Sequence, residues 1–147
     1  MMDGPSYTRT CEGCDLTAKT DLGGNQVIGW GHNSASIAPG TVWTQERADS
    51  QFSEDYADAQ TAARVVVGRG FLGLDPVRQA ALVDMCYELG SAGLAQFRHM
   101  LLAVNFKEWD AASEACLAST YAEQVPERAA RTASMLLTGN WPKGYGG

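Results

Sequence analysis

Apolar residues recur at steps of three and four along residues 44–67, which is the spacing of one face of an α-helix. Thr44 is a favourable N-cap at the start of this segment, and Gly68 and Gly70 interrupt the pattern after it. We therefore predict a long helix over residues 44–67. Its buried face carries Ala48, Phe52, Tyr56, Ala59 and Ala63.

The second half of the chain shows helical spacing in shorter segments. Asp75 and Pro76 favour the start of a core helix, and Gly90 favours its end. The apolar stripe of this helix consists of Val77, Ala81, Met85 and Leu89. Further helices are predicted over residues 94–104, 107–118 and 126–137, and Gly139 stops the last of them.

The N-terminal part has a different pattern. Residues 5–15 predict a short helix with Pro5 in its first turn, whereas residues 21–43, rich in Gly, Asn and Ser, predict a hairpin and a loop. The whole pattern predicts an α+β, mostly α fold. The long helix would connect an N-terminal lobe with a β-hairpin to an all-helical C-terminal lobe.

Length and charge narrow the class of protein. The 147 residues match one domain with a sizeable core. The net charge of −6 argues against a nucleic-acid partner, because such proteins carry a basic footprint. No segment reaches the roughly 18 apolar residues of a membrane span. Residues 1–5 lack the basic start and apolar run of a secretory signal, so we expect no signal peptide and no membrane anchor.

Glu12 and Asp21 are the candidate chemical groups. Glu12 lies near the end of the first predicted helix and Asp21 at the start of the predicted hairpin, an arrangement that can hold two acids facing each other. Glycoside hydrolysis uses such a pair, one acid to protonate the leaving oxygen and one to activate water or attack the sugar. Their spacing alone is more typical of a solvated acid and a turn-initiating aspartate than of a catalytic pair.

A longer motif surrounds these acids and consists of Glu12-Gly13, Asp21, Gly24 and residues 27–32, VIGWGH. Four later segments follow in a fixed order: residues 81–90 (ALVDMCYELG), 109–112 (WDAA), 124–131 (QVPERAAR) and 138–141 (TGNW). Together these motifs resemble the phage-type lysozymes, glycoside hydrolase family 24. The resemblance covers about residues 8 to 141.

The resemblance implies a lysozyme-like two-lobe fold, with an N-terminal lobe of about residues 12–60 and a C-terminal lobe of about residues 1–11 and 61–147. It implies an endolysin that binds peptidoglycan glycan strands between the lobes. The bond cut would be the β-1,4 bond between N-acetylmuramic acid and N-acetylglucosamine, and no cofactor or metal would be needed. We expect a monomer that stays in the host cytoplasm until a holin lesion, or delivery from the virion, brings it to the periplasm and cell wall.

The resemblance also implies roles for individual residues. Glu12 would be the general acid, and Asp21 would be the base or electrostatic partner on the opposite face of the sugar; the inversion typical of the family favours a base that activates water. Arg128 matches the arginine that pairs with the catalytic glutamate. His32 and Asp55 match a pair that ties the hairpin to the long helix.

Val27 departs from the family pattern, since it stands where the family has a threonine that helps to hold the attacking water. Valine keeps the shape of threonine but has no hydroxyl, so we expect reduced activity. Alternation along the predicted strand suggests Asn25 as a replacement contact. The substrate-binding positions implied by the resemblance are Tyr87, Glu88, Tyr121, which replaces a tryptophan, and Gln124.

The four cysteines have separate interpretations. Cys86 and Cys116 lie among apolar residues at helical spacing, which predicts small core residues. Cys11 and Cys14 flank Glu12, and a C-x-x-C pair can hold a disulfide or a metal. We expect two reduced thiols there, because zinc needs further ligands and His32 and His99 are the only histidines.

Two other classes of function stay open. One is a peptidoglycan-binding module, or a weakened enzyme, that keeps the cleft and loses turnover, which Val27 motivates. The other is a structural virion protein that uses the same fold.

Overall fold

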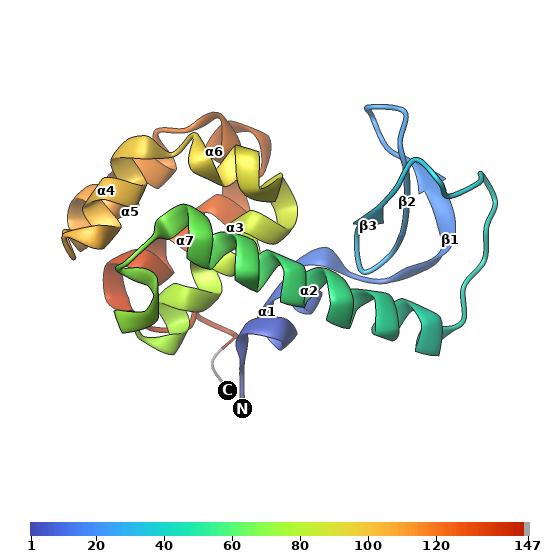
Figure 1. The fold of residues 1–147 in the computed structure, drawn as a ribbon, viewed down its shortest axis with the longest axis horizontal. Helices are drawn as coiled ribbons and strands as arrows, with labels where there is room; N and C mark the ends of the chain where they lie inside the picture. The colour runs from blue at the N-terminus through green and yellow to red at the C-terminus, as the bar shows by residue number, and fades with distance from the viewer. Residues whose placement is uncertain (146–147) are drawn as a thin grey trace. The chain divides into compact units, whose positions relative to one another are not determined.

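The computed structural model describes residues 1–145. It is mostly helical with a small antiparallel sheet, which confirms the predicted fold class (Figure 1). The chain divides into two compact units. The hairpin unit comprises Thr8–Asp58, and the helical unit comprises Met1–Tyr7 and the residues from Ala59 onward.

The first helix, α1, is Gly4–Glu12, and the sheet has the order β1-β2-β3 (Figure 1). Its strands are β1 (Asp15–Thr20), β2 (Gln26–Gly29) and β3 (His32–Asn33). The prediction of a helix to residue 15 was wrong, because Gly13 has φ +71° and ends the helix at Glu12. Asp21 consequently lies in the turn between β1 and β2, and does not begin the hairpin.

The strand register places three side chains in one row of the sheet. Val27 in the central strand is opposite Lys19 in β1 and Asn33 in β3. Residues directly opposite in an antiparallel pair point to the same face. Ile28, the next residue along, points to the other face and is fully buried.

The long helix α2 is Gln45–Val67, as predicted. Thr44 caps it, because its Oγ1 accepts a hydrogen bond from the Arg47 amide at 3.1 Å. The predicted buried face is confirmed, since the buried residues of this helix include Ala48, Phe52, Tyr56, Ala59 and Ala63.

The helical unit contains a short 3₁₀ helix, Phe71–Gly73, followed by five helices. These are α3 (Pro76–Ala95), α4 (Arg98–Asn105), α5 (Trp109–Leu117), α6 (Thr120–Gln124) and α7 (Pro126–Thr138), and α7 packs against α3, α5 and α6 (Figure 1). The predicted break at Gly90 is present, with φ 77°, but helical turns resume as far as Ala95. The sequence pattern did not predict α6, which Ser119 caps through a bond from the Ala122 amide.

The core of the helical unit follows most of the predicted stripe. Val77, Ala81 and Met85 are buried, whereas Leu89 is only half-buried. Cys86 and Cys116 are both buried, which confirms their interpretation as core residues. Within residues 1–145, no helix is both long and apolar enough to cross a bilayer.

Candidate active site

Glu12 is the last residue of α1 and is half-buried against the turn between β2 and β3. A Cβ atom built on Gly31 would stand 2.5 Å from Oε1 of Glu12 and 3.0 Å from its carboxyl carbon. Gly31 also has φ +85°, a conformation that side chains disfavour. A glycine is therefore needed here for two reasons, and it lets the Glu12 carboxyl lie directly against the backbone.

Asp21 is exposed, and the backbone of its own turn holds its carboxylate. Oδ1 accepts hydrogen bonds from the amides of Gly23 and Asn25, each at 2.9 Å. Oδ2 lies 3.4 Å from Nδ2 of Asn33 on β3. The turn thus fixes one oxygen, while the other lies toward the neighbouring strand.

Val27 is half-buried in the middle of the sheet, opposite Asn33. Asn25 precedes β2 and belongs to the turn, where its backbone amide contacts Asp21. The expectation that Asn25 shares a strand face with Val27 is therefore not supported, since strand alternation begins at Gln26. The asparagine directly across from Val27 is Asn33, which follows the VIGWGH motif and was not predicted as a site residue.

The predicted contact between His32 and Asp55 is present. Nδ1 of His32 lies 2.7 Å from Oδ2 of Asp55, and Gln51 donates to the other oxygen of Asp55 at 2.9 Å. The imidazole also packs against the Trp43 ring, with 5.8 Å between centroids. These contacts tie β3 to α2 next to the turn that receives Glu12.

Trp30 adds a second tie between the same turn and α2. Its Nε1 donates to Oδ1 of Asp49 at 2.9 Å. The pKa of Asp49 lies below its usual range, mainly because of this bond, with smaller contributions from the Gln45 side chain and the charge of Arg9. The Arg9 guanidinium lies over two rings of this region. Its Cζ atom is 5.1 Å from the ring centroid of Phe52 and 5.9 Å from that of Trp30.

Arg128 lies in the helical unit and is buried on α7. It forms a bidentate pair with Asp84, at 3.0 and 2.8 Å, and its Nε also lies 3.0 Å from Oε2 of Glu88. Asp84 has no solvent exposure and was not singled out from the sequence, although a carboxylate inside the apolar segment 81–86 was a signal for such a partner. The pairing of Arg128 with Glu12 stays a prediction.

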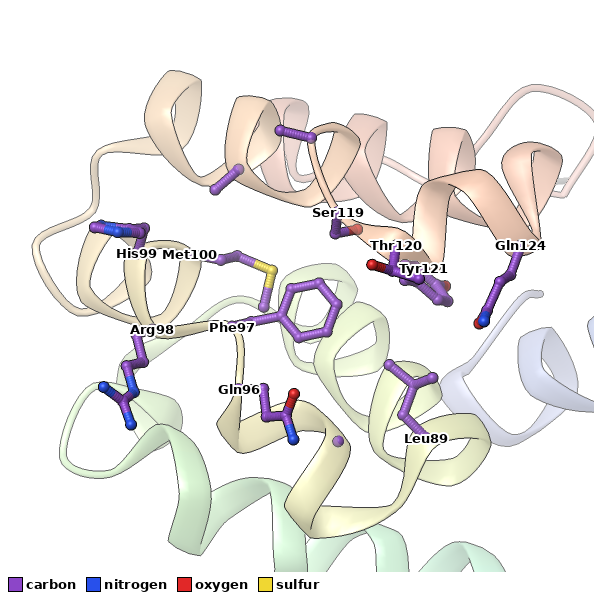
Figure 2. Close-up of a pocket in the computed structure, with 13 residues that line it drawn as sticks. Leu89, Gln96, Phe97, Arg98, His99, Met100, Ser119, Thr120, Tyr121 and Gln124 are labelled. Carbon is purple, nitrogen blue, oxygen red and sulfur yellow. The ribbon is translucent and has the colours of Figure 1, made fainter.

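A cavity of about 450 Å³ in the helical unit includes two of the predicted substrate-binding residues, Tyr121 and Gln124 (Figure 2). Tyr121 is buried, and its hydroxyl forms a 3.2 Å hydrogen bond with Oγ1 of Thr132. Burial is the main cause that raises the pKa of its phenol. Figure 2 shows the Phe97 ring directed into the cavity. Tyr87 and Glu88 are half-buried on α3, and the substrate roles of all four residues stay predictions.

The cysteines beside Glu12 are thiols. Cys11 is half-buried, and Cys14 is exposed with its Sγ 3.7 Å from Nε2 of Gln45. Across residues 1–145, no group of three or more His, Cys, Asp and Glu side chains is arranged to hold a metal ion.

Comparison with known proteins gives one family and several relatives. The profile of the phage lysozyme family matches residues 9–133. The pre-baseplate central spike protein Gp5 of Enterobacteria phage T4 is 35% identical over 104 residues, which are 69% of this chain and 18% of that protein. An endolysin of Lactococcus phage c2 is 32% identical over 107 residues, 69% of this chain and 46% of the endolysin.

A more distant relative is the probable T4-type lysozyme 1 of Dictyostelium discoideum, 24% identical over 100 residues, 67% of this chain and 59% of that protein. The chain thus spans less than two thirds of each of these three relatives.

Proposed function

Because this chain belongs to the phage lysozyme family, we propose that it is an endolysin-type muramidase acting on peptidoglycan. The bond cut is the β-1,4 bond between N-acetylmuramic acid and N-acetylglucosamine. The observation that carries this proposal is the placement of Glu12 and Asp21 within one compact unit, where the Glu12 carboxyl lies against Gly31 and backbone amides of its own turn hold Asp21. The similarity to an endolysin and to a T4-type lysozyme supports it.

The two acids have surroundings suited to different tasks. Glu12 is half-buried against Gly31, and in this proposal its carboxyl gives a proton to the leaving oxygen. Asp21 is exposed and keeps Oδ2 outside its own turn, so that this oxygen can accept the proton of a water molecule. The water oxygen attacks the anomeric carbon as the bond to the leaving oxygen breaks, and the configuration inverts.

His32 and Trp30 serve the reaction indirectly in this proposal. Their bonds to Asp55 and Asp49 hold the β2–β3 turn on α2, and Gly31 in that turn sets the position of Glu12. Loss of either bond should misplace the acid without removing it. Arg128 is proposed to orient the acid. The residues proposed to bind the glycan are Tyr87, Glu88, Tyr121 and Gln124.

The proposal is tested on purified sacculi and on Gram-negative cells with a permeabilised outer membrane. We expect lysis together with the release of reducing ends, and Glu12→Gln should lower the rate by about 100-fold or more. Glu46→Gln is the matched control, because Glu46 is exposed in the first turn of α2 in the same unit. Release of amines without reducing ends would identify an amidase or peptidase and overturn the proposal.

The similarity to Gp5 favours a second candidate, a cell-wall-binding or structural component of a virion. Release through a holin lesion from the host cytoplasm belongs to the first candidate, and delivery from a particle to this one. The two candidate functions are distinguished by measuring both retention on sacculi and the release of reducing ends. Retention on sacculi with no reducing ends, equal for the parent and Glu12→Gln, would support a binding or structural role.

A further inference from the structure

Asn33 is the one residue of β3 that faces both Val27 and Asp21. It pairs directly with Val27 across the sheet, and its Nδ2 lies 3.4 Å from Oδ2 of Asp21. Its side chain is exposed. An amide therefore stands between the proposed base and the position that lacks a hydroxyl.

The contact from Asn33 reaches the oxygen of Asp21 that the turn does not fix. Oδ1 already accepts two backbone amide bonds at 2.9 Å, from Gly23 and Asn25. Neither of these amides bonds to Oδ2. At 3.4 Å, the contact from Asn33 is longer than the ~2.7–3.2 Å of an ordinary N–H···O bond, and it is therefore weaker than the two backbone bonds to Oδ1.

We propose that Asn33 is a positioning residue for the hydrolytic water, in place of the hydroxyl that Val27 lacks; this inference rests on the proposed muramidase function. A side-chain amide has two N–H donors and one carbonyl oxygen. One N–H holds Oδ2 of Asp21, and the rest of the amide contacts the water above Val27. Because a carboxylate oxygen has two lone pairs, Oδ2 accepts both this bond and the proton of the water.

Valine fits this arrangement through its shape. It fills the place of threonine in the row Lys19, Val27 and Asn33, yet offers no donor or acceptor to the water. The polar group thus lies on β3, at Asn33, and no longer on β2, at position 27. It still contacts the Asp21 carboxylate. Asn33 acts through Asp21 and the water, so its removal should affect turnover and leave glycan binding unchanged.

The test measures kcat and KM separately on a soluble glycan fragment of peptidoglycan. Asn33→Ala should lower kcat about tenfold and leave KM within about twofold, the effect of losing one hydrogen bond in the transition state. Asn33→Asp is the second variant. It keeps the size but sets a second carboxylate against Asp21, so kcat should fall further. The matched control is Gln26→Ala, an amide truncation on the opposite face of β2, where Nε2 bonds to Thr20.

A rescue variant separates positioning from a merely structural role. Val27→Thr should raise kcat of Asn33→Ala about tenfold but raise kcat of the parent by less than about threefold, since the two groups do the same task. Equal effects of Val27→Thr in both backgrounds would overturn the inference. So would a fall in kcat that merely follows a lower melting temperature.

The failure of this inference is distinguishable from the failure of the proposed function. A parent that releases no reducing ends overturns the muramidase proposal and this inference with it. An active parent whose kcat is unchanged in Asn33→Ala overturns the role of Asn33 alone. An active parent with the kcat loss and the rescue supports both.

Discussion

Asp21 in the hairpin unit and Asp84 in the helical unit are the same residue type held in opposite ways. Asp21 is exposed, and two backbone amides of its own turn bind one of its oxygens. Asp84 has no exposure, and the guanidinium of Arg128 binds both of its oxygens. Solvent and neutral backbone amides are enough to stabilise the charge of the exposed Asp21 carboxylate. The buried carboxylate of Asp84 is stable in the interior only beside a full opposite charge.

The difference indicates which aspartate can take part in chemistry. Asp84 has no solvent exposure, and both of its oxygens accept hydrogen bonds from Arg128 in a buried ion pair, so substrate and solvent do not reach it. Asp21 keeps one oxygen outside its turn. The two sites therefore predict opposite results for stability and activity when each is altered.

The largest effect should come from breaking the buried pair. Arg128→Met leaves the Asp84 carboxylate buried without its cation, which should cost about 3–5 kcal/mol of unfolding free energy. For a chain of this size, that lowers Tm by roughly 10 °C or more. Thermal unfolding followed by circular dichroism measures the change. Arg69→Met, an exposed arginine, is the control and should change Tm little; an equal loss in both variants would show that the pair contributes nothing special.

The second effect should be on activity alone. Asp21→Asn keeps the size of the side chain and an oxygen for the two backbone amides, but it removes the proposed base. We expect the rate of reducing-end release to fall about 100-fold or more and Tm to stay within about 2 °C. If Asp21→Asn lowered Tm as much as Arg128→Met, the exposed aspartate would be a structural residue and the contrast would be lost.

The sequence alone predicted the elements whose pattern is long and local. The helix α2 was predicted correctly because its apolar spacing repeats over many turns and Thr44 caps it. The five residues of α6 are too few to show a period, and β1 was missed because the helix was extended past Gly13. The positions where these short elements begin and end depend on sequence signals of only one or two residues.

The candidate site was predictable in part for the same reason. Glu12 and Asp21 belong to one short motif and were found through it. Asn33 was missed, because its importance depends on the register that pairs it with Val27. Asp84 was missed, because its partner lies 44 residues away in the sequence. Long-range pairing is a property of the folded chain that no local pattern specifies.

A third prediction concerns the buried thiol of Cys116. Burial raises the pKa of the Cys116 thiol to about 12, far above the ~8.5 of an unfolded chain. The folded state therefore binds this proton more tightly, so its contribution is complete below pH ~8.5 and is lost as the pH rises toward 12. Stability should fall with pH by up to ~1.4 kcal/mol per unit.

Urea unfolding at pH 8, 9 and 10 measures this slope. Cys116→Ala should flatten it, while Cys14→Ala, an exposed thiol, should leave it as in the parent. Cys86 is also buried with a raised thiol pKa, so part of the slope should persist in Cys116→Ala. Identical slopes in the two variants would contradict the assignment to Cys116.

The smallest effect should come from Asp49, an exposed carboxylate held by side chains. Its pKa is lowered, first by the bond from Trp30, then by the Gln45 side chain and the charge of Arg9.

A depressed folded pKa contributes stability above the unfolded pKa of ~3.9, and this contribution disappears as the pH falls through the folded value. The parent should thus have a slightly higher Tm than Asp49→Asn at pH 6, and the difference should shrink as the pH is lowered below ~3.9. Asp58→Asn, which alters an exposed aspartate later in α2, is the matched control. A Tm difference that persists unchanged in acid would mean that Asp49 acts through packing or neutral hydrogen bonds, and that its charge plays no part in holding Trp30.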